Sequence, residues 1–199
     1  MQKFDGYENI QVSEGSTKLP AGGYRCIIKQ VKIEAWTNGK QGESLVLAFD
    51  ILEGEYKDHF KKQFDSQTQN KKWPGTYRTE APSNASSDKS KEMFKRLITA
   101  IERSNPGFNW DWDENKLKGK KVGFVFGEVE RKKQDGSGTY MWTEPRWPRS
   151  LDTVLEADIP APKMLQGNNS SAPLTSVAGT PVASWTPNVP VDDDDDMPF

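Results

Sequence analysis

The composition of the chain changes abruptly near residue 157, and this change limits the part that can fold. Residues 157–199 contain seven of the 13 prolines, together with many Ser, Thr, Ala and Asn residues. Such a segment cannot bury enough apolar surface to offset the entropy that it would lose on ordering. We therefore expect a folded domain over residues 1–156, which is long enough for one hydrophobic core, and a disordered tail over residues 157–199.

The two parts also differ in the sign of their net charge. The whole chain has 27 Lys and Arg against 29 Asp and Glu, a formal charge of −2. Six aspartates and one lysine lie in residues 157–199, so the tail carries −5 and the domain carries +3. Because the acidic balance belongs to the tail, it does not argue against nucleic-acid binding by the domain.

Hydrophobic periodicity within the domain predicts five strands and one helix. The strands are expected at residues 23–36, 44–52, 56–65, 120–131 and 139–147, and the amphipathic helix at residues 88–104. In the first strand the apolar alternation changes phase between Ile28 and Val31, which indicates a β-bulge. Three strands, a helix and two strands predict a mainly β fold, namely a five-stranded OB-type Greek-key barrel with one helix between strands 3 and 4. Another small β-barrel fits the same periodicity.

One cysteine and one histidine restrict the chemistry that the chain can perform. Cys26 alone excludes an internal disulfide and a Cys-based zinc site. His59 lies in a charged stretch and is expected at the surface. Glu-x-Lys triplets at residues 55–57 and 114–116 are a weak nuclease pattern that a chain rich in Glu and Lys produces by chance. We therefore expect no enzyme activity, no metal and no cofactor.

No apolar run has the length of a signal peptide or a membrane span. We therefore expect the protein in the reducing cytoplasm, with no membrane partner. The sequence also shows no coiled-coil or other assembly signal, so a homo-oligomer stays open.

Basic and aromatic residues lie next to one another along the domain, which is the mixture that single-strand binders use. Cations neutralise the phosphate backbone, and flat rings stack on bases without regard to sequence. Two of the groups fall in the expected hairpin loops at residues 36–44 and 131–138, which flank the usual groove of an OB barrel. The candidate single-stranded DNA-binding residues are Trp36, Lys40, Lys61, Lys62, Phe64, Lys72, Trp73, Tyr77, Arg78, Arg131, Lys132, Lys133, Tyr140 and Trp142.

Trp110 and Trp112 are not among these candidates, because Asp111, Asp113 and Glu114 beside them would repel phosphate. We expect both tryptophans to be structural.

The last eight residues combine a charge run with an apolar end. They are Asp192, Asp193, Asp194, Asp195, Asp196, Met197, Pro198 and Phe199. A partner protein would need an apolar pocket for the terminal ring, a basic group for the terminal carboxylate and a basic ridge for the aspartates. Charge would speed the encounter between the two proteins. We therefore predict that this tip binds partner proteins.

The tip resembles the acidic C-terminal tip, ending in Pro-Phe, of bacterial single-stranded DNA-binding proteins. Met197 replaces the Ile or Leu that this family usually has before Pro-Phe. The domain is similar to single-strand binders of phages and prophages of Gram-positive hosts in the segments LPAGGY (19–24), LVLAFDILEGEYK (45–57), WPGTYR (73–78), SNPGFNWDWDE (104–114) and LKGKKVGFVFGE (117–128).

This resemblance implies an OB fold that coats and protects single-stranded DNA, without catalysis, during phage DNA replication and recombination in the bacterial cytoplasm. It also implies that the tip recruits replication, recombination and repair proteins. Two alternatives stay open: a recombination mediator or annealing protein, and a metal-dependent nuclease.

Overall fold

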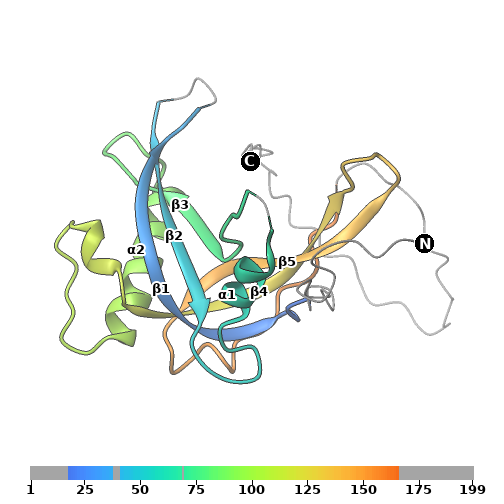
Figure 1. Cartoon of the computed structure of the whole chain (residues 1–199). Coiled ribbons are helices and arrows are strands. Elements are labelled where there is room, and N and C mark those ends of the chain that lie inside the picture. Colours follow the sequence, from blue (N-terminus) through green and yellow to red (C-terminus); the bar gives the residue numbers. More distant parts are fainter. Residues whose placement is uncertain (1–17, 38–40, 69, 166–199) are drawn as a thin grey trace, which may run out of the picture. The chain divides into compact units, whose positions relative to one another are not determined.

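In a computed structural model, which describes residues 18–37, 41–68 and 70–165, five strands form one antiparallel sheet in the order β3-β2-β1-β4-β5 (Figure 1). The strands are β1 (Gly22–Ala35), β2 (Glu43–Ile51), β3 (Thr76–Glu80), β4 (Lys121–Lys132) and β5 (Thr139–Arg149). The helices are α1 (His59–Ser66), α2 (Asp88–Ser104) and the 3-10 helix η2 (Glu114–Leu117). The prediction of a mainly β fold with a helix between the third and fourth strands is confirmed.

The long, bent strand β1 joins the two halves of the sheet. Its register with β2 runs from Cys26 to Ala35, and its register with β4 runs from Gly22 to Ile27. The β2 register shifts between Ile28 and Gln30, so the predicted bulge is confirmed. A bulge bends its strand, and Figure 1 shows β1 curving from one partner to the other.

The core packs residues of the sheet against α2, with further residues from α1 and η2. Phe49, Phe124 and Phe126 are fully buried, and the ring centroids of Phe49 and Phe124 lie 4.7 Å apart. From α2, Leu97 and Ile101 complete this cluster. The helix starts where the sequence predicts it, because the Ser87 hydroxyl accepts a hydrogen bond from the backbone N–H of Ser90.

The third strand predicted at residues 56–65 is wrong, because α1 occupies most of that segment. The third strand is the five-residue β3, which pairs with β2 from Thr76↔Ala48 to Glu80↔Ser44. Its Tyr77 and Thr79 face the interior, while Thr76 and Arg78 are exposed. A strand this short carries little periodic signal, which is why the longer polar and aromatic segment before it appeared the better candidate.

The packed chain continues past the predicted domain boundary at residue 156 and reaches Leu165. Lys163 forms a bridge to Val129, with its backbone N–H donating to the Glu128 carbonyl at 2.9 Å. This bridge adds to the edge of β4 beyond its pairing with β1. Over the residues that the structure describes, no helix is long and apolar enough to cross a membrane.

Candidate nucleic-acid interface

The outer part of the β4–β5 hairpin, residues 127–144, extends beyond the rest of the sheet, and we call it the arm. Its two strands pair from Gly127↔Glu144 to Lys132↔Thr139. The connection closes with the backbone N–H of Lys133 donating to the Gly138 carbonyl at 2.9 Å. This is the fourth hairpin predicted from the sequence. β1 pairs with β4 only as far as Phe126, and the bridge between Val129 and Lys163 covers the base of the arm, so the outer end of the arm projects as a two-stranded hairpin (Figure 1).

The arm presents two exposed rings beside a group of cations. Tyr140 and Trp142 are 43% and 41% exposed, and alternate residues of a strand share one face. Arg131 pairs in register with Tyr140, and its guanidinium binds the Glu144 carboxylate at 2.5 Å. This ion pair holds the arginine beside the rings.

The exposed ammonium groups at the end of the arm complete this basic and aromatic surface. Lys132 and Lys133 are both exposed, and neither side chain forms an ion pair within the described part of the chain. Their charge is therefore available to an anion.

A pocket of about 250 Å3 lies between α1 and β5. Its lining residues are Lys18, Leu19, His59, Phe60, Gln63, Tyr140, Met141, Trp142 and Thr143. Most of these side chains are apolar or aromatic, and a few are polar. A mostly apolar pocket with several convergent polar groups is the usual form of a ligand site.

A buried carboxylate places α1 beside this pocket. Asp50, at the end of β2, is fully buried and accepts hydrogen bonds from the backbone N–H groups of Phe60 at 3.0 Å and Lys61 at 3.2 Å. Burial raises the pKa of Asp50, and these backbone hydrogen bonds oppose the rise. Asp58, which precedes α1, has a left-handed φ of 57° and makes no side-chain cap. Asp50 therefore supplies the acceptor that a helix N-terminus needs.

His59 is buried in the pocket wall, so the surface position predicted for it is wrong. Its side chain packs against Phe60, with the ring centroids 5.1 Å apart, and its Nε2 lies 2.9 Å from the Gln63 Nε2. Desolvation by burial lowers the pKa of His59. The imidazole is therefore neutral at pH 7 and has one donor and one acceptor nitrogen.

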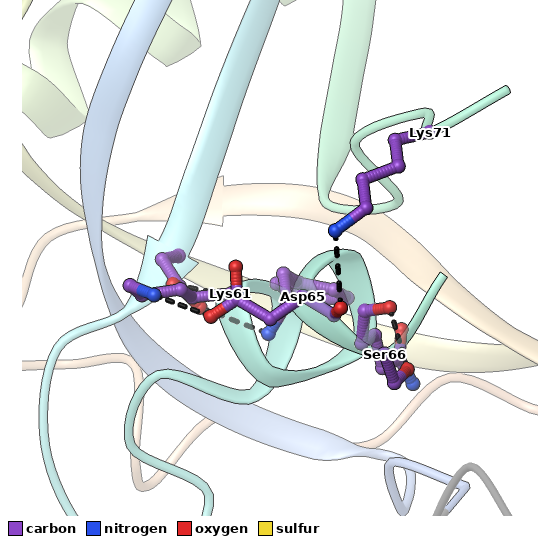
Figure 2. Close-up of polar contacts among 7 residues, drawn as sticks. Lys61, Asp65, Ser66 and Lys71 are labelled. Carbon is purple, nitrogen blue, oxygen red and sulfur yellow. Dashed lines mark hydrogen bonds and ion pairs between the residues drawn. The ribbon is translucent and has the colours of Figure 1, made fainter. Parts of the chain in front are cut away.

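The lysines of α1 and of the segment after it surround Asp65. Figure 2 shows Lys61 in an ion pair with the Asp65 carboxylate and Lys71 donating to the Asp65 carbonyl at 3.1 Å. The hydrogen bond that Lys61 donates to the Asp65 carboxylate raises the pKa of Lys61. Lys62 is exposed on the same helix. These lysines lie on the α1 side of the site, where Asp65 offsets the charge of Lys61.

Phe64 and Trp73 lie next to this surface but serve mainly in packing. Their ring centroids are 5.5 Å apart, and both side chains are half-buried. The Trp73 indole N–H donates to the Phe49 carbonyl at 2.9 Å. Lys72 is exposed, and its backbone N–H donates to the Gln67 side chain at 2.7 Å.

Of the two predicted DNA-binding residues on β3, one lies in the core and the other lies at the surface. Tyr77 is only 6% exposed, and its ring centroid lies 4.8 Å from that of Phe124. Burial raises the pKa of Tyr77 to about 12. Its ring cannot stack on a base without leaving the core, so the assignment of Tyr77 to the binding site is wrong. Arg78 is exposed and binds Glu34 at 2.5 Å.

Trp36 closes the first hairpin. Its indole N–H donates to the Ser44 hydroxyl at 2.9 Å, and its ring covers Gly42, where a Cβ atom would lie 2.7 Å from the ring. The half-buried ring therefore helps to close the β1–β2 turn. Lys40 lies outside the described residues, and so does the tip at residues 192–199.

The structure therefore brings the arm and α1 together around one pocket. Among the described residues, none of the β1–β2 hairpin lines this pocket. Sequence patterns alone missed His59, Gln63 and Thr143 as pocket residues. They share a pocket because α1 and β5 both line it, an arrangement that no local sequence pattern reports.

A second aromatic group lies after α2, at what we call the Trp corner: Phe94, Trp110 and Trp112. The structural role predicted for Trp110 is confirmed, because it packs against the core. The same prediction for Trp112 is wrong, since its side chain is 73% exposed. Its ring stacks on Phe94 with centroids 6.1 Å apart and an angle of 12° between the planes.

Within the described ranges, no three His, Cys, Asp or Glu side chains gather as metal ligands. No protein-family model matches the chain, and no curated protein matches it significantly.

Proposed function

We propose that this protein binds single-stranded DNA on the surface formed by the arm and α1. The observation that carries the proposal is the pair of exposed rings, Tyr140 and Trp142, on a hairpin whose end carries the exposed side chains of Lys132 and Lys133, which form no ion pair with the residues that the structure describes. Stacking on such rings contributes about 1–3 kcal/mol per base, and it tolerates any base sequence. Cations beside the rings neutralise the phosphates.

The fold that accompanies this proposal is an OB-type barrel. Two observations support it: the five-stranded antiparallel sheet, and the position of α2 between β3 and β4. In such barrels the fourth hairpin borders the nucleic-acid groove, and here that hairpin is the arm. The binding would serve phage DNA replication and recombination, as the resemblance of the sequence implies.

The test is a titration of fluorescently labelled oligo-dT with the full chain at several salt concentrations. The logarithm of the affinity should fall linearly with the logarithm of the salt concentration, with a slope of about −0.7 per phosphate contact. Absence of binding at low salt would refute the proposal. Intact DNA after incubation with Mg2+ would remove the nuclease alternative, and no acceleration of strand pairing would remove the annealing alternative.

The tip at residues 192–199 is proposed to bind replication, recombination and repair proteins through Phe199 and the aspartates. Its charge also gives it a measurable effect on DNA binding, because five carboxylates compete with phosphates for the same cations. Deletion of residues 192–199 should tighten oligo-dT binding at low salt and have little effect at high salt. Deletion of residues 197–199 alone is the matched control, since it keeps the aspartates and should leave the affinity unchanged.

A further inference from the structure

We propose that a basic cleft between α2 and the end of β5 binds phosphate groups of the single strand whose bases stack on the arm. This inference rests on the proposed function and deepens it, because it assigns a second phosphate-binding site at the opposite end of β5. The cleft has a volume of about 270 Å3, and its lining residues come from segments 92–103 and 148–153.

The charged side chains that line the cleft are mostly cationic. They are Lys95, Arg96, Arg103 and Arg149, against the single carboxylate of Glu92. Arg96 and Glu92 form an ion pair with each other at 2.8 Å, so their charges cancel. The other three cations form no ion pair with the residues that the structure describes. The lining therefore has a net charge of +3 that comes from these three side chains.

An acidic residue beside the cleft offsets part of this charge. Asp152 is exposed, and a hydrogen bond with the Ser150 side chain lowers its pKa, with a smaller contribution from the charge of Arg103. Asp152 is therefore ionised at neutral pH. It reduces the net charge of the cleft and its border to +2, which an anion from outside the domain would neutralise.

The cations approach the cleft from two elements. Lys95, Thr99 and Arg103 follow one another at intervals of four residues, so they share one face of α2. Lys95 and Arg103 are exposed. Arg149 comes from β5, and one of its guanidinium N–H groups donates to the Pro148 carbonyl at 3.4 Å. It makes no other hydrogen bond with the described residues.

This combination of donors suits phosphate. A guanidinium offers a planar fork of N–H groups that matches two phosphate oxygens, and lysine adds a compact charge. The hydroxyl-bearing residue Thr99 lines the same cleft, and threonine is a common contact of DNA phosphates. Apolar and aromatic side chains, which would be needed to stack on a base, are few in the lining. The cleft is therefore suited to the backbone of the strand and not to its bases.

The distance between the cleft and the arm rings is short enough for one strand to reach both. Trp142 and Arg149 lie seven residues apart on β5, which corresponds to about 23 Å of strand. OB folds bind up to about 16 nucleotides each. Such a length spans about 54 Å even at the close spacing of stacked nucleotides in a duplex.

The test is a titration of the full chain with oligo-dT of about 16 nucleotides at several salt concentrations, followed by fluorescence anisotropy. It compares the wild-type protein with Lys95→Gln combined with Arg103→Gln. Glutamine has nearly the same helix propensity as lysine and arginine, and both positions are exposed, so the variant should keep the wild-type melting temperature. Lys89→Gln combined with Lys118→Gln is the matched control, because it removes the same charge from exposed positions outside the cleft.

The cleft variant should reduce the log–log salt slope by about 1.4, which is 0.7 for each lost phosphate contact, and should weaken binding about tenfold near 0.2 M salt. The control variant should keep the wild-type slope. Arg103→Lys keeps the charge and should also keep the slope, because counterion release depends on charge.

Equal slopes for the cleft variant and the control variant would overturn the proposal. Tighter binding by the cleft variant at low salt would also overturn it, since the cleft would then hold an acidic peptide segment in place of DNA. Both results differ from the failure of the proposed function, in which the wild-type protein binds no oligo-dT at low salt.

Discussion

The arm and the Trp corner both expose aromatic rings, but the charged residues beside the rings differ: Arg131 pairs in register with Tyr140 on the arm, whereas Asp111 and Asp113 flank Trp112 at the corner. On the arm, Trp142 is 41% exposed, and Lys132 and Lys133 are exposed towards the end of the same hairpin. At the corner, Trp112 is 73% exposed beside Asp111, whose carboxylate forms an ion pair with Lys116. Exposure alone would select the corner as the binding site. Phosphates accompany every base, so the charge beside a ring decides whether it can stack on DNA.

The two regions also hold their rings by different means. The arm uses regular strand alternation, which places Tyr140 and Trp142 on one face. The corner places Trp112 outward with a left-handed φ of 68°, a conformation that is rare for bulky residues. The comparison shows that the arm is built from ordinary local geometry and is therefore open to prediction from sequence, whereas the corner is not.

The largest change in DNA affinity should come from removing the two exposed rings of the arm. Tyr140→Ala combined with Trp142→Ala should weaken oligo-dT binding by about 1–3 kcal/mol per ring that stacks on a base. Trp112→Ala removes a more exposed ring and should change the affinity by less than about twofold, because acidic neighbours keep phosphates away. Fluorescence anisotropy with a labelled oligonucleotide measures both. Similar losses from the two changes would show that the charge argument is wrong.

A smaller effect should come from α1, which the arm site needs and the corner does not. Asp50→Ala leaves the backbone N–H groups of Phe60 and Lys61 without their acceptor and should destabilise the fold by about 1–3 kcal/mol. Chemical denaturation measures this loss, and hydrogen exchange should locate it at α1. Asp50→Asn keeps one acceptor oxygen and serves as the control, with a smaller loss. Unchanged exchange at α1 in the alanine variant would contradict the assigned role of Asp50.

The cations at the end of the arm should appear in the salt dependence. Lys132→Ala combined with Lys133→Ala should reduce the log–log salt slope by about 1.4, which is 0.7 for each phosphate contact. Lys89→Ala combined with Lys118→Ala removes the same charge from exposed positions on α2 and after η2, and should leave the slope nearly unchanged. Equal slopes for the two double variants would mean that net charge alone, and not its position on the arm, controls binding.

The smallest effect concerns pH. Because burial lowers the pKa of His59, the unfolded chain binds a proton more readily than the folded chain. His59 therefore makes its full contribution to the free energy of unfolding at pH values above the pKa of the unfolded chain, which is near 6.5. This contribution is lost as the pH falls below that pKa. Denaturation between about pH 7 and pH 5 should show this loss in the wild-type protein and a flatter profile in His59→Gln. Identical profiles would mean that His59 is solvated.

At the corner, the corresponding titration lies at lower pH. The hydrogen bond from Lys116 lowers the pKa of Asp111. The contribution of this carboxylate to the free energy of unfolding is therefore present at pH values above the ordinary aspartate pKa, near 3.9, and is lost as the pH falls below it. The free energy of unfolding of an Asp111→Asn variant should therefore depend on pH in the same way as that of the wild-type protein down to about pH 5.

The sequence predicted those elements whose periodicity is local. The amphipathic pattern of α2, the phase change at the β1 bulge and the turn that closes the arm all depend on neighbouring residues, and the structure contains each of them. The exposure of Tyr140 and Trp142 agrees with their place in the predicted binding surface, although their contact with DNA stays a prediction.

The errors concern features that depend on distant contacts. The helical start of α1 depends on Asp50, which lies ten residues before Phe60 and ends a buried strand. The burial of Tyr77 depends on the register between β3 and β2. The pocket is lined by α1 and β5, which lie about 80 residues apart in the sequence, and hydrophobic periodicity reports only local structure.

The central claim is that DNA contacts the arm and not the Trp corner, and tryptophan fluorescence during an oligo-dT titration tests it directly. Trp142→Phe and Trp112→Phe each keep an aromatic ring and remove one indole signal. The quenching on DNA binding should be reduced in Trp142→Phe and retained in Trp112→Phe. Retained quenching in Trp142→Phe, with a loss in Trp112→Phe, would contradict the account and place the binding site at the Trp corner.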